Sequence, residues 1–134
     1  MRVVRQRSVA LILARELAVN LATPRWIWEE EGSLVYFNEP AEQIVGRRMQ
    51  EVGALHQDEL FRFEPEDLDG RPIDPRQLPS AVALRTRQPS HRRLRITGLD
   101  GVKRTIEATA FPLFTRGDEF VGAVTVFWQS ADEA

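Results

Sequence analysis

Three strand-like segments joined by two short turns make up the last third of the chain, and this pattern most limits the folds open to it. Between the first two segments, Gly101 fits a three-residue hairpin loop whose glycine adopts left-handed backbone angles. The third segment is apolar on both faces, as is typical of a central strand. The pattern therefore predicts an antiparallel meander with strands at residues 90–97, 103–114 and 120–128.

The hairpin loop also sets the register of the first two strands. Counting back from the turn places Leu94 opposite Ile106 and Arg93 opposite Glu107. One face of the hairpin is then apolar, while the other carries cross-strand ion pairs. This predicts that the apolar face covers a core.

Ahead of the meander, the pattern predicts two short strands and several short helices. Gly32 separates two aromatic-rich segments that read as a strand hairpin. Asn38 stands where a helix N-cap is expected and Gly46 stands just past the end of that helix. Gly53 is a point at which the next helix is expected to split. The predicted elements are strands at 25–30 and 33–37 and helices at 39–45, 49–61 and 79–87.

The first segment of the chain is predicted to form an apolar helix that begins after an N-cap at Ser8. Leu13, Leu17 and Leu21 fall on one face of this helix, and other apolar residues widen the face. Such a helix packs on its own domain or buries a second face against a partner, and both readings stay open. For a dimer interface we expect Leu13, Leu17 and Leu21, together with Trp128 at the end of the sheet. The chain is thus divided into a capping or dimerisation helix (1–24), a core (25–129) and a tail (130–134).

Composition excludes several classes of function. The 134 residues carry a net charge of -2, which favours neither nucleic acid nor an anionic membrane as a partner. There is no cysteine, so disulfides and thiol chemistry are excluded, and the two histidines do not predict a metal site. The apolar run from Val9 to Ala14 is too short for a signal peptide or a membrane span, and we expect a cytoplasmic protein.

The order and spacing of several short motifs resemble the PAS domain family. No single motif is specific, but together they cover residues 22–127. The motifs are Gly32-Ser-Leu-Val-Tyr-Phe-Asn38, Ala41-Glu42, Ile44-Val45-Gly46, Asp69-Gly70-Arg71-Pro72, Leu78-Pro79, Ala83-Leu84, Pro89, Asp100-Gly101, Arg104-Thr-Ile106, Pro112-Leu113 and Gly122-Ala123-Val124.

The resemblance implies an α+β fold, in which a five-stranded antiparallel sheet carries short helices on one face and an N-terminal helix precedes it. It also implies a stand-alone bacterial sensory or regulatory domain with a pocket between the sheet and the helices. Strand alternation and the resemblance together predict the residues that line this pocket. They are Tyr36, Ile44, Phe61, Leu84, Leu94, Ile96, Ile106 and Val126.

The family's cofactors are mostly not expected here. Flavin chemistry through a cysteine adduct is excluded because the chain has no cysteine, and the predicted helix at 79–87 lacks the histidine that would bind haem. His56 and His91 are expected at the surface. A non-covalent small ligand remains open, either apolar or an anion held by Arg92 or Arg104 at the pocket edge; otherwise the arginines form a solvated, ion-paired face.

Three functional hypotheses remain. The first is a non-catalytic sensory homodimer that reads a small ligand and contacts a signalling protein; the second is a ligand-free interaction module. The third, a small enzyme on a similar fold, is not favoured because no carboxylate stands at a recognisable spacing from a histidine or nucleophile. Pocket volume separates the first two, because a filled interior leaves no room for a ligand.

The family's Asp-x-Thr motif at the end of the last strand is replaced here by Gln129, Ser130 and Ala131. We therefore expect signal output through the N-terminal helix or an exposed face of the sheet.

Overall fold

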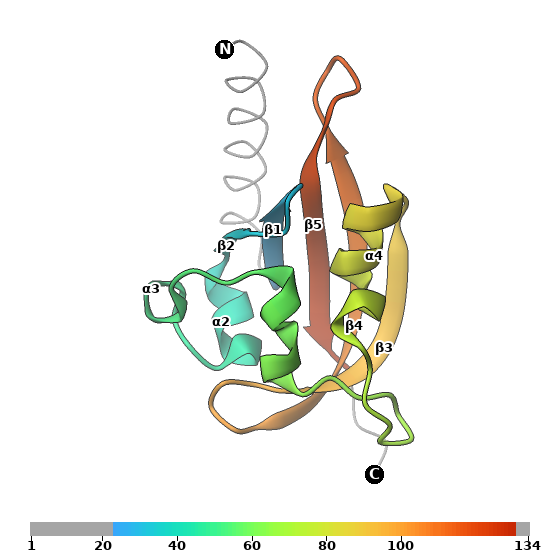
Figure 1. Cartoon of the computed structure of the whole chain (residues 1–134). Helices are drawn as coiled ribbons and strands as arrows, with labels where there is room; N and C mark the ends of the chain where they lie inside the picture. The colour runs from blue at the N-terminus through green and yellow to red at the C-terminus, as the bar shows by residue number, and fades with distance from the viewer. Residues whose placement is uncertain (1–22, 131–134) are drawn as a thin grey trace.

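The computed structural model describes residues 23–130, so the predicted N-terminal helix with Leu13, Leu17 and Leu21 lies outside the described residues. Figure 1 shows how the described elements follow one another. They are β1 (Arg25–Glu29), β2 (Leu34–Phe37), α2 (Glu39–Val45), α3 (Met49–Val52), the 3-10 helices η1 (Gln57–Phe63) and η2 (Pro75–Gln77), α4 (Pro79–Thr86), β3 (Ser90–Thr97), β4 (Lys103–Phe114) and β5 (Phe120–Gln129).

The five strands form one antiparallel sheet in the order β2-β1-β5-β4-β3, which confirms the predicted fold class. The predicted hairpin register is also confirmed, since Leu94 pairs with Ile106 and Arg93 with Glu107. Gly101 has a φ of 82°, as its place in the loop requires. The first and last strands of the chain thus meet at the centre of the sheet, where β1 pairs with β5.

The helix that follows β2 begins and ends where the sequence predicts. The Asn38 side chain accepts a hydrogen bond from the Ala41 N–H, and Gly46 ends α2 in the left-handed region with a φ of 85°. The second predicted helix does split after Val52, at Gly53, into α3 and the 3-10 helix η1.

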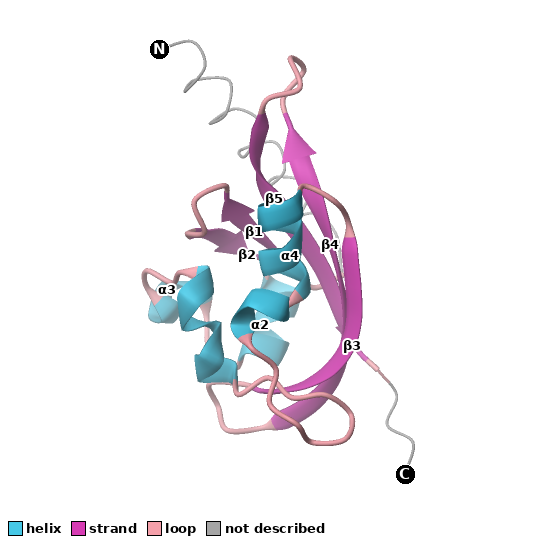
Figure 2. Ribbon diagram, turned by 45° about the vertical axis from the view of Figure 1, so that its right-hand side comes forward, coloured by secondary structure: helices cyan, strands magenta, loops and turns pink. Residues whose placement is uncertain are grey.

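All of these short helices lie on one side of the sheet, as Figure 2 shows. The core lies between the two layers, where side chains of the inner sheet face such as Trp28, Leu94 and Phe127 meet Val45 and Leu60 from the helices. We call the opposite side of the sheet the outer face. It carries its own small apolar cluster around the fully buried Ile27, formed with Val35, Leu113 and Val124.

None of the helices in residues 23–130 combines the length and apolar character needed to cross a bilayer.

Candidate functional site

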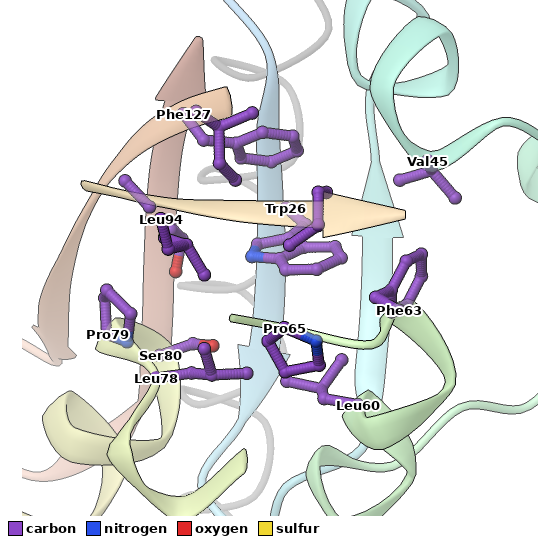
Figure 3. Close-up of a pocket in the computed structure, with 14 residues that line it drawn as sticks. Trp26, Val45, Leu60, Phe63, Pro65, Leu78, Pro79, Ser80, Leu94 and Phe127 are labelled. Atoms are coloured by element: carbon purple, nitrogen blue, oxygen red, sulfur yellow. The ribbon is translucent and has the colours of Figure 1, made fainter. Parts of the chain in front are cut away.

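A small, partly open cavity lies between the inner face of the sheet and the helical layer (Figure 3). Its volume is about 40 Å³, counted as the space open to the centre of a water molecule. The lining residues come from seven elements and the loops between them: Trp26, Val45, Leu60, Phe63, Pro65, Leu78, Pro79, Ser80, Leu94, Ile96, Ile106, Ala108, Thr125 and Phe127.

Trp26 is held at the sheet side of the cavity by other aromatic rings. Its ring centroid lies 5.1 Å from that of Trp28, 5.1 Å from that of Phe127 and 6.0 Å from that of Phe63. The first and the last of these contacts are edge-to-face, and such aromatic pairs add about 0.5–1.5 kcal/mol beyond the burial of their area. They stabilise the position of the indole at the cavity wall.

The cavity wall has no ionisable side chain, and its accessible surface is almost entirely apolar. Among residues 23–130, five buried side-chain nitrogen or oxygen atoms have no hydrogen-bond partner, and two of these, Trp26 Nε1 and Thr125 Oγ1, belong to lining residues. The Ser80 hydroxyl donates a long hydrogen bond of 3.4 Å to Gln57 Oε1. No lining residue supplies an acid or a base for proton transfer.

Several predicted pocket residues do meet around this cavity. Leu94, Ile96 and Ile106 line it from β3 and β4. Ile44 is buried in the same core cluster, and Leu84 packs against the edge of that cluster from α4, but neither lines the cavity.

Three other predicted pocket residues do not line this cavity. Val126 lies on the outer face, because the pairing of β5 with β1 turns Thr125 and Phe127 inward. Tyr36 pairs with the outer-facing Ile27 of β1, and its neighbour Phe37 takes the inner position. On η1, Phe61 is 61% exposed because the 3-10 turn directs Phe63 inward instead.

Sequence reasoning did not select Thr125 at all. The one available signal was a lone threonine within the apolar run of the last strand. Assigning it to the cavity requires the register of β1 against β5, which pairs Thr125 with Trp26 and joins strands far apart in the sequence.

Both histidines lie away from the cavity with exposed side chains, as predicted, and each also has a hydrogen-bonding partner. His56 Nε2 lies 2.7 Å from the Glu31 carbonyl oxygen, and His56 Nδ1 accepts a 3.2 Å hydrogen bond from the Asp58 N–H at the start of η1. His91 Nδ1 lies 2.7 Å from Thr109 Oγ1 on the outer face. In residues 23–130, no group of three or more acidic or histidine side chains is arranged to hold a metal ion.

Arg104, one of the two candidates for gripping an anion, already holds a carboxylate of the chain itself. Its guanidinium donates hydrogen bonds of 3.0 and 3.3 Å to the two oxygens of Asp100 and one of 3.3 Å to the Ile44 carbonyl oxygen. The hydrogen bonds from Arg104 are the main reason that the pKa of Asp100 is lowered. Arg92, the other candidate, does not line the cavity.

An antiparallel sheet of this strand order, with short helices and a cavity on one face, defines a recognisable class of α+β domain. The family model described as "PAS domain" matches residues 24–129. The chain therefore belongs to the PAS domain family, whose members are sensory signalling domains and are generally not catalytic.

Solved structures show the same fold at low sequence identity. The PAS domain of the fruit-fly ELK potassium channel has a TM-score of 0.73 at 9% identity, covering 91% of this chain and 98% of that chain. The PAS domain of Bordetella pertussis BvgS has a TM-score of 0.62 at 15% identity, with 92% and 87% covered. The light-state dimer of the fungal photoreceptor Vivid has a TM-score of 0.61 at 11% identity, with 82% and 79% covered. No match was found among curated proteins.

Proposed function

We propose that this PAS domain is a non-catalytic sensory module that takes up a small molecule in its interior cavity and passes the response to another protein. The observation that carries the proposal is a small apolar cavity between the sheet and the helical layer. A molecule that fits this cavity is held mainly by burial of its apolar surface, at about 25 cal/mol per Å².

The cavity volume limits the ligand to a small one. A water molecule needs roughly 10–15 Å³ on the same measure, so a 40 Å³ cavity has room for about three waters or a ligand of roughly four to six non-hydrogen atoms. A flavin or haem is much larger than this, and such a cofactor would require the helical wall to move outward.

Part of the cavity wall belongs to the 3-10 helix η1 and the connection after it, which we expect to move more easily than a long α-helix. Leu60 and Phe63 lie on η1, and Pro65 follows in the connection to η2. Short 3-10 segments have poorer hydrogen-bond geometry than an α-helix. Ligand uptake would act by population shift, in which the molecule favours the arrangement of this wall that binds it more tightly.

The outer face is the surface that we propose for partner contact. Phe111 and Trp128 are 43% and 39% exposed there, on neighbouring strands. PAS domains commonly dimerise or contact signalling partners, and one of the similar structures is itself a dimer. A homodimer through this face, with Trp128 in the interface, fits these side chains.

A second candidate function is a ligand-free interaction module. The small cavity volume favours it, because the interior is almost filled by the core side chains. In that case the outer face alone would carry the function.

The test is to identify small molecules released from the freshly purified domain by denaturation and mass spectrometry. Ala108→Val adds two methyl groups to the cavity from β4, whereas Thr109→Val, at the next residue, faces outward and changes no atom that lines the cavity. We expect a molecule at near-stoichiometric amount from the wild type and Thr109→Val and a strongly reduced amount from Ala108→Val. An empty wild type together with a more stable Ala108→Val variant would support the interaction module instead.

A further inference from the structure

The cavity between the sheet and the helical layer offers almost no hydrogen-bonding surface to a molecule inside it. Of the residues that line it, Trp26, Ser80 and Thr125 carry polar side-chain atoms. Trp26 Nε1 and Thr125 Oγ1 are buried within the protein, and the Ser80 hydroxyl donates to Gln57 Oε1. The accessible wall is almost wholly apolar, so a molecule in the cavity contacts carbon on nearly every side.

Such a wall disfavours ions and polar molecules. Among the lining residues there is no lysine, arginine, histidine, aspartate or glutamate to balance a charge. A hydroxyl, amide or carbonyl group that enters the cavity leaves its hydrogen bonds to water and gains none in return, which lowers the affinity steeply. The molecule that binds best is therefore one without hydrogen-bonding groups.

The volume of the cavity limits the molecule further. It is about 40 Å³. An apolar cavity of about 150 Å³ in another protein stays dry and takes up benzene or xenon. We therefore expect a molecule smaller than benzene.

The lining also attracts a molecule of this kind. Trp26, Phe63 and Phe127 line the cavity with aromatic rings, and Leu60 and Leu78 lie across the space from Phe127 (Figure 3). Side chains beside an unfilled space lack contact atoms on one side, and a molecule of the right size restores these dispersion contacts. The attraction therefore needs no polar group on the molecule.

We propose that the cavity selects a small neutral molecule without hydrogen-bonding groups, of the size of a dissolved gas or a short hydrocarbon, over polar molecules of the same size. This inference rests on the proposed function, since it names the chemical class of molecule that the domain senses.

The test compares isobutene with acetone, its polar isostere, on the whole chain with ¹³C-labelled leucine and isoleucine methyl groups. Both compounds have four non-hydrogen atoms, so they differ in the carbonyl oxygen and hardly in size. The methyl signals of Ile106, a lining residue, are assigned from their loss in Ile106→Val. We expect isobutene to move these signals in a saturable way and acetone to bind at least about tenfold more weakly, because its oxygen finds no donor in the cavity.

Two controls locate the binding. The methyl signals of Leu113, in the apolar cluster of the outer face, should not move with either compound. Ala108→Val should weaken isobutene binding at least about tenfold, whereas Thr109→Val should leave it unchanged. Circular dichroism of each variant shows whether it is folded.

Xenon distinguishes a gas from a hydrocarbon within the proposed class. Saturable shifts of the Ile106 methyl signals with both xenon and isobutene would support the whole class. Shifts with xenon alone would support it and restrict the molecule to the size of a gas.

Three results would overturn the inference. Acetone binding at the Ile106 methyl groups as tightly as isobutene would leave the sensory cavity in place and remove the apolar selectivity. A polar or charged molecule released from the purified domain at near-stoichiometric amount would support the proposed function and contradict this ligand class. Binding of neither isobutene nor xenon would exclude the class, and the proposed function would fail with it only when the purified domain also carries no small molecule.

Discussion

The two faces of the sheet use the same strands for different purposes. On β5, Phe127 is 2% exposed within the core, whereas the next residue, Trp128, is 39% exposed on the outer face. Because successive side chains of a strand alternate between faces, one residue decides whether an aromatic ring stabilises the fold or remains available to a partner. Residue type alone does not distinguish the two positions.

Two threonines, one on each face of the sheet, show a similar contrast. Thr125 is 2% exposed and has a hydroxyl without a partner, while Thr109 of the outer face has its hydroxyl 2.7 Å from His91 Nδ1. A threonine in partial contact with solvent needs no further explanation. A buried hydroxyl without a partner costs about 1–3 kcal/mol of stability.

The largest expected difference is between Phe127→Ala and Trp128→Ala. Phe127→Ala should lower the free energy of unfolding by about 3–5 kcal/mol, since it removes a buried ring and enlarges the cavity. Trp128→Ala should lower it by at most about 1 kcal/mol. Urea denaturation of both variants at low protein concentration measures this, and equal losses would show that both faces are packed cores.

Trp128→Ala also tests whether the outer face is a dimer interface. If the outer face is a contact surface, the variant should shift the chain toward the monomer in sedimentation experiments, while Phe111→Ser should do the same from the neighbouring strand. Wild-type chain that is already monomeric at high micromolar concentration would contradict a homodimer through this face.

Local patterns in the sequence were enough to predict most of the fold. The cap at Asn38, the left-handed Gly46 and the hairpin at Gly101 depend on residues close together in the chain, and all three are confirmed. The pairing of Leu94 with Ile106 followed directly from that hairpin. Short-range rules therefore predicted the order of elements and the β3–β4 register.

The cavity was predicted less well, because it depends on long-range pairing. The apolar run of β5 contains no alternation, so the sequence offered no reason to prefer Thr125 over Val126 for the inner face. Phe61 and Phe63 likewise differ only in their position on a 3-10 turn, which helical periodicity does not describe.

Two neighbouring residues of β5, Thr125 and Val126, can each be given the side chain of the other. Thr125→Val should raise the free energy of unfolding of the ligand-free domain by about 1–2 kcal/mol, because it removes a buried hydroxyl that has no partner. Val126→Thr, on the outer face, should change it by no more than about 0.5 kcal/mol. Thermal and urea denaturation check both, and a destabilised Thr125→Val would mean that the hydroxyl is bonded to an ordered water.

The smallest expected effect concerns the polar contact that joins the two layers beside the apolar core. Arg104 of β4 bonds both Asp100 and the Ile44 carbonyl of α2, so Asp100→Asn should weaken the attachment of the helix to the sheet by about 0.5–1 kcal/mol at neutral pH. The pKa of Asp100 is lowered in the folded protein, chiefly by its hydrogen bonds from Arg104. The Asp100 carboxylate therefore makes its full contribution to the free energy of unfolding above its unfolded-state pKa of about 4. This contribution is lost as the pH falls through the lower pKa of the folded state.

Urea denaturation at several pH values separates this ion pair from the apolar contacts between the layers. The difference between wild type and Asp100→Asn should be constant from pH 7 to about pH 5 and should shrink at lower pH as the carboxylate of Asp100 becomes protonated. Asp69→Asn, in an exposed loop, is the matched control and should show a smaller difference at every pH. A difference for Asp100→Asn that persisted in acid would show that Asp100 acts through its backbone turn rather than through its charge, and the two layers would then be joined by apolar packing alone.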